Sequence, residues 1–444
     1  MKDRSLFYRI AWYCGAVSVV SFPVSISLSQ AGISFAAIAW MAGIVAHSDV
    51  PRFPWPRLLI AGLCIYGLEL LSLLLLSFSG GGFAFIKQGL SREIKDVFLI
   101  LMAFWVFAFS EDEDRRKTIE KLTYIAIGIL IVSGLIGIFS RYRLSNIPYH
   151  LMHGWEGNMQ ARYQHHAGTF LAGTPLMFHI YLPVGFLHSH LTYGALLMMA
   201  MPILFLRAMN PIIRYTSDSK KQTLIAIMIF GAACVVFMIN NARSAILGTI
   251  FVIALTVYYY SRFHWKKKAL YLLIPAVIAL LAFGGLFIFA DLLHERLRAL
   301  VIALSGQQKH TDYQRVLLWN ASWEVIRSHP WLGVGAGHFQ ESVESILLNV
   351  SKQHPGLWYA NETLQRGHSH SDPLHILAIA GIPAFISYIV FFAMLIHRAI
   401  KPAGQAIFRF GAPGLLIAGL YQCYVLDDAV LLPFWLLVGL TLRE

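Results

Sequence analysis

The sequence predicts an all-α polytopic membrane protein, and three observations support this. Hydrophobic residues make up 57% of the 444 residues and charged residues 13%, whereas soluble domains have about 45–50% and about 25%. The apolar residues come in long runs such as "YLLIPAVIALLAFGGLFIFA" (271–290), and about 20 apolar residues are needed to cross a bilayer. The net charge of +12 is spread over short loops, so it predicts no nucleic-acid-binding face.

We expect residues 1–444 to form a single transmembrane domain with about twelve spans. The N-terminal "MKDRSLFYR" runs directly into the first span without a small-residue cleavage motif, which predicts a retained signal anchor. The sixth span is the least regular, since it mixes apolar residues with His, Pro and Gly. The predicted spans are about 9–28, 31–47, 57–78, 96–110, 119–139, 187–208, 222–240, 243–260, 268–290, 373–397, 406–423 and 428–442.

Lysine and arginine in the short loops predict the orientation, because cytoplasmic loops carry an excess of these residues. The N-terminus and four short basic loops fall on one side, so both termini are expected in the cytoplasm. The loop 140–186 and the loop 291–372 then lie outside, in the periplasm of a bacterium. The four loops are "EDEDRRKTIEK", "RAMNPIIRYTSDSKK", "SRFHWKKK" and "HRAIKPAGQAIFR".

The outer loop 291–372, inserted between spans 9 and 10, is expected to be partly helical. Apolar residues recur at roughly helical spacing in 312–328, and 341–352 has the pattern of a second amphipathic helix. The Pro/Gly-rich "HPWLGVGAGHF" separates them. Its glycines do not follow a strand or open a βαβ unit, so they predict a close turn and no nucleotide site.

The stretch "RGHSHSDPLH" (366–375) places its titratable residues directly before span 10. Asp372 and Pro373 fit the N-cap and first position of a helix, and one interpretation is that the histidines are merely solvated beside this cap. A second is a metal site with H-x-H-x-D spacing, which needs further ligands. A third is a neutral imidazole that acts as general base at the membrane surface. The four cysteines lie in or beside apolar segments, so a zinc–thiolate site is not expected.

Three arginines are candidates for binding an anion. Arg243, in "NNARSAIL", lies at an outer span end, where it either snorkels to the interface or presents its planar guanidinium to phosphate oxygens. Arg315 lies on the predicted loop helix and Arg162 in "NMQARYQHH". Both are placed to converge on the same anion, although Arg315 also fits the polar face of an amphipathic helix.

Two motifs resemble the O-antigen ligase/polymerase superfamily of membrane glycosyltransferases. "DYQRVLLWNASWEVIRSHPWLGVGAGHF" matches its R…W…hP.lGvG.G.F stretch, and "HSHSDPLHILAIAGIPAF" matches a His before a span with L…l…G.pg. Arg243 matches an Arg at an outer span end. Ser371 and Ala242 depart from the superfamily's usual Asn and Ser. The matching residues are Arg315, Trp319, Pro330, Gly333, Gly335, Gly337, Phe339, His370, Leu374, Gly381 and Pro383.

The resemblance implies a GT-C-like fold and a function. Length and the absence of a C-terminal soluble domain suggest that the ligases are the nearest members. Such enzymes transfer a glycan from undecaprenyl diphosphate to lipid A–core oligosaccharide at the periplasmic face of a Gram-negative inner membrane. No metal, cofactor or obligate protein partner is expected. The alternatives are an O-antigen polymerase, a protein O-oligosaccharyltransferase and a transporter of anionic solutes.

The expected site combines catalytic and substrate-binding residues. His370 is expected to be the general base, with Arg243 and Arg315 stabilising the diphosphate. Substrate binding is expected from Arg162, His368, Arg366 and Asp372.

Overall fold

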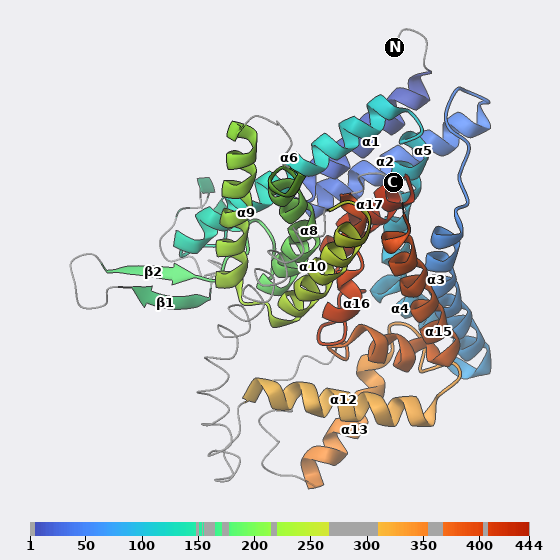
Figure 1. Cartoon of the computed structure of the whole chain (residues 1–444). Helices are drawn as coiled ribbons and strands as arrows, with labels where there is room; N and C mark the ends of the chain where they lie inside the picture. The colour runs from blue at the N-terminus through green and yellow to red at the C-terminus, as the bar shows by residue number, and fades with distance from the viewer. Residues whose placement is uncertain are drawn as a thin grey trace.

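The computed structural model is a bundle of α-helices with one small β-hairpin (Figure 1). The hairpin was not predicted. Its strands β1 (His166–Phe170) and β2 (Phe178–Tyr181) are antiparallel and pair Thr169 with His179. The structure describes residues 5–147, 151–152, 154, 165–170, 177–214, 220–265, 310–353, 367–402 and 407–443.

Several helices begin at a residue whose side chain caps them. Ser25 accepts a hydrogen bond from the Leu28 N–H at the start of α2, and Asp112 accepts from the Asp114 N–H at the start of α6. The helices of the described part are α1 (Leu6–Ser21), α2 (Ile26–Val45), α3 (Arg57–Leu76), α4 (Gly82–Arg92), α5 (Leu101–Phe109), α6 (Glu113–Phe139), α8 (His190–Arg214), α9 (Lys220–Asn240), α10 (Arg243–Phe263), α12 (His310–Ser328), α13 (Phe339–Gln353), α15 (Asp372–Ile400), α16 (Gly414–Ala418) and α17 (Asp428–Arg443).

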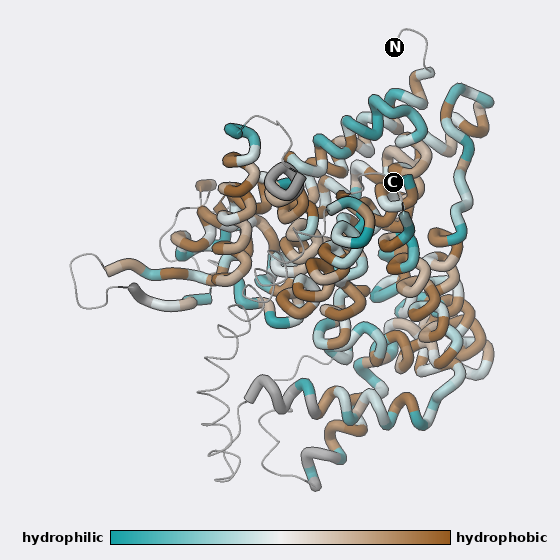
Figure 2. The backbone as a smooth tube through the Cα atoms, in the orientation of Figure 1, coloured by the Kyte–Doolittle hydropathy of each residue, from teal (hydrophilic) through white to brown (hydrophobic). Residues whose placement is uncertain are grey.

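The described part contains seven helices that are long and apolar enough to cross a membrane. Large apolar side chains face outward on several of them, as Ile38 (58% exposed), Val132 (55%) and Met228 (62%) show. Figure 2 shows a mainly hydrophobic bundle with hydrophilic residues where α6 begins. Exposed apolar surface on this scale indicates contact with lipid, so the chain is a multi-pass membrane protein.

Three predicted spans differ from the structure, and a fourth lies outside the described residues. The span 9–28 includes the end of α1 at Ser21 and the start of α2 at Ile26. The span 96–110 is divided between a 3₁₀ helix, Ile94–Ile100, and α5. The span 406–423 was wrong as a continuous helix: it contains a short 3₁₀ turn, the five-residue α16 and a non-helical continuation. Pro413 lacks an N–H, and glycines on both sides lower helix propensity, which explains the interruption. The span 268–290 lies outside the described residues.

Both helices predicted from "DYQRVLLWNASWEVIRS" and "ESVESILLNVSK" are present, as α12 and α13. Figure 1 shows them lying across the end of the bundle opposite the C-terminus. The Pro/Gly-rich connection between them turns toward α15 and forms backbone hydrogen bonds with it.

Helix α15 is interrupted at Gly381, where φ is +74°. Pro383 has no N–H to donate to the Ile379 carbonyl, which a regular helix would require. That carbonyl instead accepts from the Gly335 N–H at 2.9 Å, and the Ala378 carbonyl accepts from the Val334 N–H at 2.9 Å. The Ile382 N–H donates to the Pro330 carbonyl at 2.9 Å. The α12–α13 connection therefore completes the backbone hydrogen bonding of the broken helix.

This contact predicts that Gly333 cannot be replaced. Its φ is +63°, and an added Cβ would lie 2.4 Å from the Ile379 carbonyl carbon. We expect Gly333→Ala to lower the free energy of unfolding by about 1–3 kcal/mol, as forced overpacking does. Thermal unfolding in detergent measures this. The matched control is Gly128→Ala in α6, where no heavy atom lies within 4 Å of the added Cβ. Equal midpoints for the two variants would contradict the prediction.

Candidate active site

His370 lies in a tight turn immediately before α15. Its φ is +53°, in the left-handed region that residues other than glycine seldom adopt. The His370 N–H donates a hydrogen bond to His368 Nδ1 at 3.2 Å, and the two rings pack edge to face with centroids 4.3 Å apart. Backbone strain of this kind is typical of functional sites. His368 therefore holds the turn that presents His370.

The His370 ring contacts Gln422 in the segment 419–427, between α16 and α17. The distance from His370 Nδ1 to Gln422 Oε1 is 3.3 Å. An amide oxygen can only accept, so Nδ1 carries the proton in this contact. In a neutral imidazole the other nitrogen, Nε2, then has a lone pair available to take a proton.

The surroundings favour neutral imidazoles. Burial lowers the pKa of His370 below its usual value, the hydrogen bond to Gln422 partly opposes this, and the positive charge of Arg315 adds to the lowering. Burial, together with His370 and His375, lowers the pKa of His368 to about 3. Both rings are therefore uncharged at neutral pH, which is the state that a general base requires.

Asp372 is the first residue of α15, and Ser371 is the N-cap, so the predicted N-cap role of Asp372 was wrong. The Asp372 carboxylate does not cap its own helix. Its Oδ1 accepts from the backbone N–H groups of Tyr424 at 2.6 Å and Val425 at 3.0 Å. The side chain is buried, so Asp372 holds the segment 419–427 against α15.

Arg243 is the first residue of α10, and its side chain is exposed. The adjacent Ser244 Oγ lies 2.9 Å from the Tyr424 hydroxyl, which joins the start of α10 to the segment that carries Gln422. Arg315 extends from α12 within electrostatic reach of His370 and Tyr424. The structure thus gathers α10, α12, α15 and the segment 419–427 at one place.

Of the other predicted site residues, Arg162 and Arg366 lie outside the described residues. Gln422 was not predicted, because it falls inside the assumed span 406–423. A signal was present in "YQCYVLDD" (421–428), whose polar residues interrupt two apolar stretches. An interruption of this kind is tolerated within a membrane protein where it is buried in protein or lines a cavity.

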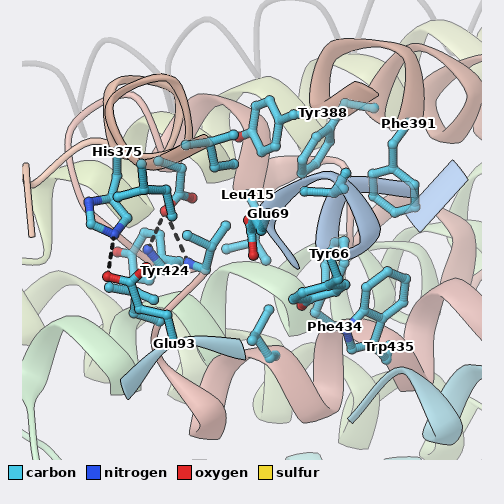
Figure 3. A pocket seen from close by; sticks show the side chains of 18 residues that line it. Tyr66, Glu69, Glu93, His375, Tyr388, Phe391, Leu415, Tyr424, Phe434 and Trp435 are labelled. Carbon is cyan, nitrogen blue, oxygen red and sulfur yellow. Dashed lines mark hydrogen bonds and ion pairs between the residues drawn. The ribbon is translucent and has the colours of Figure 1, made fainter. Parts of the chain in front are cut away.

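A cavity of about 50 Å³ lies inside the bundle, and Tyr424 is among the residues that line it (Figure 3). Tyr66, Tyr388, Phe391, Phe434 and Trp435 provide much of its lining, and Glu69 points into it (Figure 3).

A buried acid–histidine contact borders the same cavity. His375 Nε2, in the first turn of α15, lies 3.3 Å from Glu93 Oε1. Both side chains are almost completely buried, so this contact fixes the start of α15 to the residue that follows α4. Within the described residues, no three His, Cys, Asp or Glu side chains are arranged to hold a metal ion.

The fold and the site define a multi-pass membrane protein with a neutral histidine and two arginines near the start of a broken helix. Residues 226–389, from α9 into α15, match the family model described as O-antigen ligase. This match supports membership in the O-antigen ligase/polymerase superfamily, whose members are membrane glycosyltransferase-like enzymes. The match includes Arg243, Arg315 and His370. A comparison with curated proteins finds no match.

The position of Asp372 predicts that two substitutions, Asp372→Ala and Asp372→Asn, differ in thermal stability. Asp372→Ala leaves the buried N–H of Tyr424 and the partly buried N–H of Val425 without their acceptor, and a buried group left unpaired costs about 1–3 kcal/mol. Asp372→Asn keeps an oxygen that accepts. We expect the Ala variant to unfold at a clearly lower temperature than the Asn variant in detergent. An Ala variant as stable as the wild type would show that the carboxylate does not hold this segment.

Proposed function

We propose that this protein is an O-antigen ligase. It transfers a glycan from undecaprenyl diphosphate to a sugar hydroxyl of lipid A–core oligosaccharide, at the periplasmic face of a Gram-negative inner membrane. His370 is the general base, and Arg243 and Arg315 bind the diphosphate. Arg162 and Arg366 are further candidates for binding the substrate, and the reaction needs no metal ion. The observation that carries the proposal is the neutral His370 beside arginines in a chain of this superfamily.

The proposed chemistry is a direct displacement. His370 Nε2 takes the proton from the acceptor hydroxyl, and the hydroxyl oxygen attacks the anomeric carbon of the donor sugar. The bond between that carbon and the diphosphate oxygen breaks, and its electron pair leaves with undecaprenyl diphosphate. One glycosidic bond forms, one glycosyl–phosphate bond breaks, and the anomeric configuration inverts. A general base of this kind contributes about 10²–10⁴-fold.

The position of Arg243 supports an anion site. A cation at a helix N-terminus opposes the helix dipole, at a cost of about 0.3–1 kcal/mol. The first backbone N–H groups of α10 have no partners within the helix and point out of its N-terminus. Arg243 and the start of α10 together favour a bound anion. As the glycosyl–phosphate bond breaks, negative charge grows on the diphosphate, and groups that stabilise such charge usually contribute most to catalysis.

The identity of the acceptor tests the proposal. Purified protein is incubated with undecaprenyl-diphosphate-linked glycan and with either lipid A–core oligosaccharide or a second lipid-linked glycan. We expect lipid A–core to gain the glycan and His370→Ala to transfer none, while eluting as a folded protein. Near-normal turnover by His370→Ala would refute His370 as the base. Elongation of the lipid-linked glycan alone would instead identify a polymerase.

The pH dependence gives a second prediction. The base must be neutral, so the rate falls as pH drops through the pKa of His370. That pKa is below its usual value, because burial and Arg315 lower it by more than the hydrogen bond to Gln422 raises it, so activity persists below about pH 6.5. Arg315→Gln removes a cation, which raises the pKa of His370 and moves the acid limb of the pH–rate profile to higher pH. An unmoved limb would contradict electrostatic contact between Arg315 and His370.

Arginine geometry gives a third prediction. Arg243→Lys and Arg315→Lys keep the charge but lose the paired hydrogen bonds that a guanidinium makes to phosphate. Loss of one charged hydrogen bond costs about 1.5–3 kcal/mol, which is about 10–150-fold in rate if it acts in the transition state. The matched control is Arg327→Lys on α12, whose side chain pairs with Glu324 on the same helix. Nearly full activity in both test variants would place the diphosphate elsewhere.

A further inference from the structure

We propose that Gln422 is the positioning residue for His370: it accepts the Nδ1 proton, selects the tautomer and points Nε2 toward the acceptor hydroxyl. The inference rests on the proposed function, since it assigns a partner to the proposed base. It extends that function by adding a residue from the segment 419–427, which lies outside the 226–389 stretch matched by the family model.

The contact has the features of an orienting interaction. Gln422 Oε1 lies 3.3 Å from His370 Nδ1, and the Gln422 side chain is almost fully buried. A buried amide has few alternative partners, so this geometry is expected to persist. A histidine that acts through one ring nitrogen commonly has the other held by a carbonyl or carboxylate, which sets the tautomer.

The choice of an amide has a consequence for the base. A carboxylate at this position would stabilise the imidazolium and raise the pKa of His370. A neutral amide orients the ring without adding a negative charge. The groups that act on His370 in the described region are Gln422, whose hydrogen bond raises the pKa of His370, Arg315 from α12, which lowers it, and the neighbouring His368 ring. The nearby Asp372 carboxylate accepts hydrogen bonds from the Tyr424 and Val425 N–H groups and makes none to His370 among the described contacts.

The segment that carries Gln422 is held on both sides of it. Tyr424 and Val425 are bound to the Asp372 carboxylate, and the Asp372 N–H donates to the Gly419 carbonyl at 2.7 Å. A Cβ at Gly419 would lie 2.4 Å from Asp372 Oδ2, so only glycine allows this approach. His370 and Gln422 are therefore fixed to the same anchor, Asp372, from two different parts of the chain.

Two substitutions at Gln422 separate orientation from simple packing. Gln422→Met has a similar shape but no acceptor, and Gln422→Glu keeps an acceptor and adds a charge. We expect Gln422→Met to lower kcat by about 10–100-fold with little change in KM, as loss of a hydrogen bond to a group charged in the transition state does. The acid limb of the pH–rate profile of Gln422→Met moves to lower pH, because the His370 imidazolium loses its hydrogen bond to the Gln422 amide oxygen. Gln422→Glu moves the acid limb to higher pH.

The assay uses the full-length protein in detergent, with undecaprenyl-diphosphate-linked glycan and lipid A–core oligosaccharide. The matched control is Gln30→Met on α2, which removes a 2.6 Å side-chain hydrogen bond to Asp428 and leaves kcat and the acid limb unchanged. The inference is overturned if Gln422→Met has the wild-type kcat. It is also overturned if the acid limbs of the Gln422→Met and Gln422→Glu pH–rate profiles move in the same direction. If Gln422→Met does not fold, an unmoved limb in Gln422→Glu overturns it.

His370→Ala distinguishes the two levels of the proposal. If His370→Ala keeps its activity, the proposed function itself fails, whatever Gln422 does. If His370→Ala is inactive while Gln422→Met matches the wild type, the base assignment stands and only the role of Gln422 is lost.

Discussion

The break in α15 at Gly381 is the constraint on which the arrangement of the site depends. A regular helix would satisfy the carbonyls of Ala378 and Ile379 internally. With Pro383 in the chain, the Ile379 carbonyl requires a donor from outside the helix. The α12–α13 connection supplies N–H groups at Val334 and Gly335. This backbone exchange fastens the helix that carries Arg315 to the helix that follows His370, and it explains why glycines and prolines occur in both motifs.

A second contact, made by Asp372, positions the proposed catalytic residues at the start of the same helix. The Asp372 carboxylate accepts hydrogen bonds from the backbone N–H groups of Tyr424 and Val425, so the segment between α16 and α17 lies against the His370 turn. The Ser244–Tyr424 contact brings the start of α10, and with it Arg243, to this segment. Burial and Arg315 together keep His370 neutral. One buried carboxylate thus links a proposed base to the elements that would bind an anion.

Much of this architecture could be predicted from the sequence, because long apolar runs and caps act locally. The boundaries of α3 and α9, the end of α6, and the presence of α12 and α13 follow from hydrophobic pattern alone. The role of Asp372 could not be predicted, because a D-P pair also fits an N-cap and the true partners are about fifty residues away. Gln422 was missed for a related reason: a short polar interruption between apolar stretches looks like part of a span. The assignment of His370 depended on its position before a span, while its tautomer depends on a distant amide.

The most direct test of the central claim is a structure of the protein with undecaprenyl diphosphate bound, determined by cryo-electron microscopy in lipid nanodiscs. We expect the diphosphate to lie between the Arg243 and Arg315 guanidinium groups, with His370 Nε2 facing the open space beside it and His370 Nδ1 on Gln422. A diphosphate bound away from both arginines, or a His370 ring turned so that Nε2 contacts Gln422, would refute the proposed site.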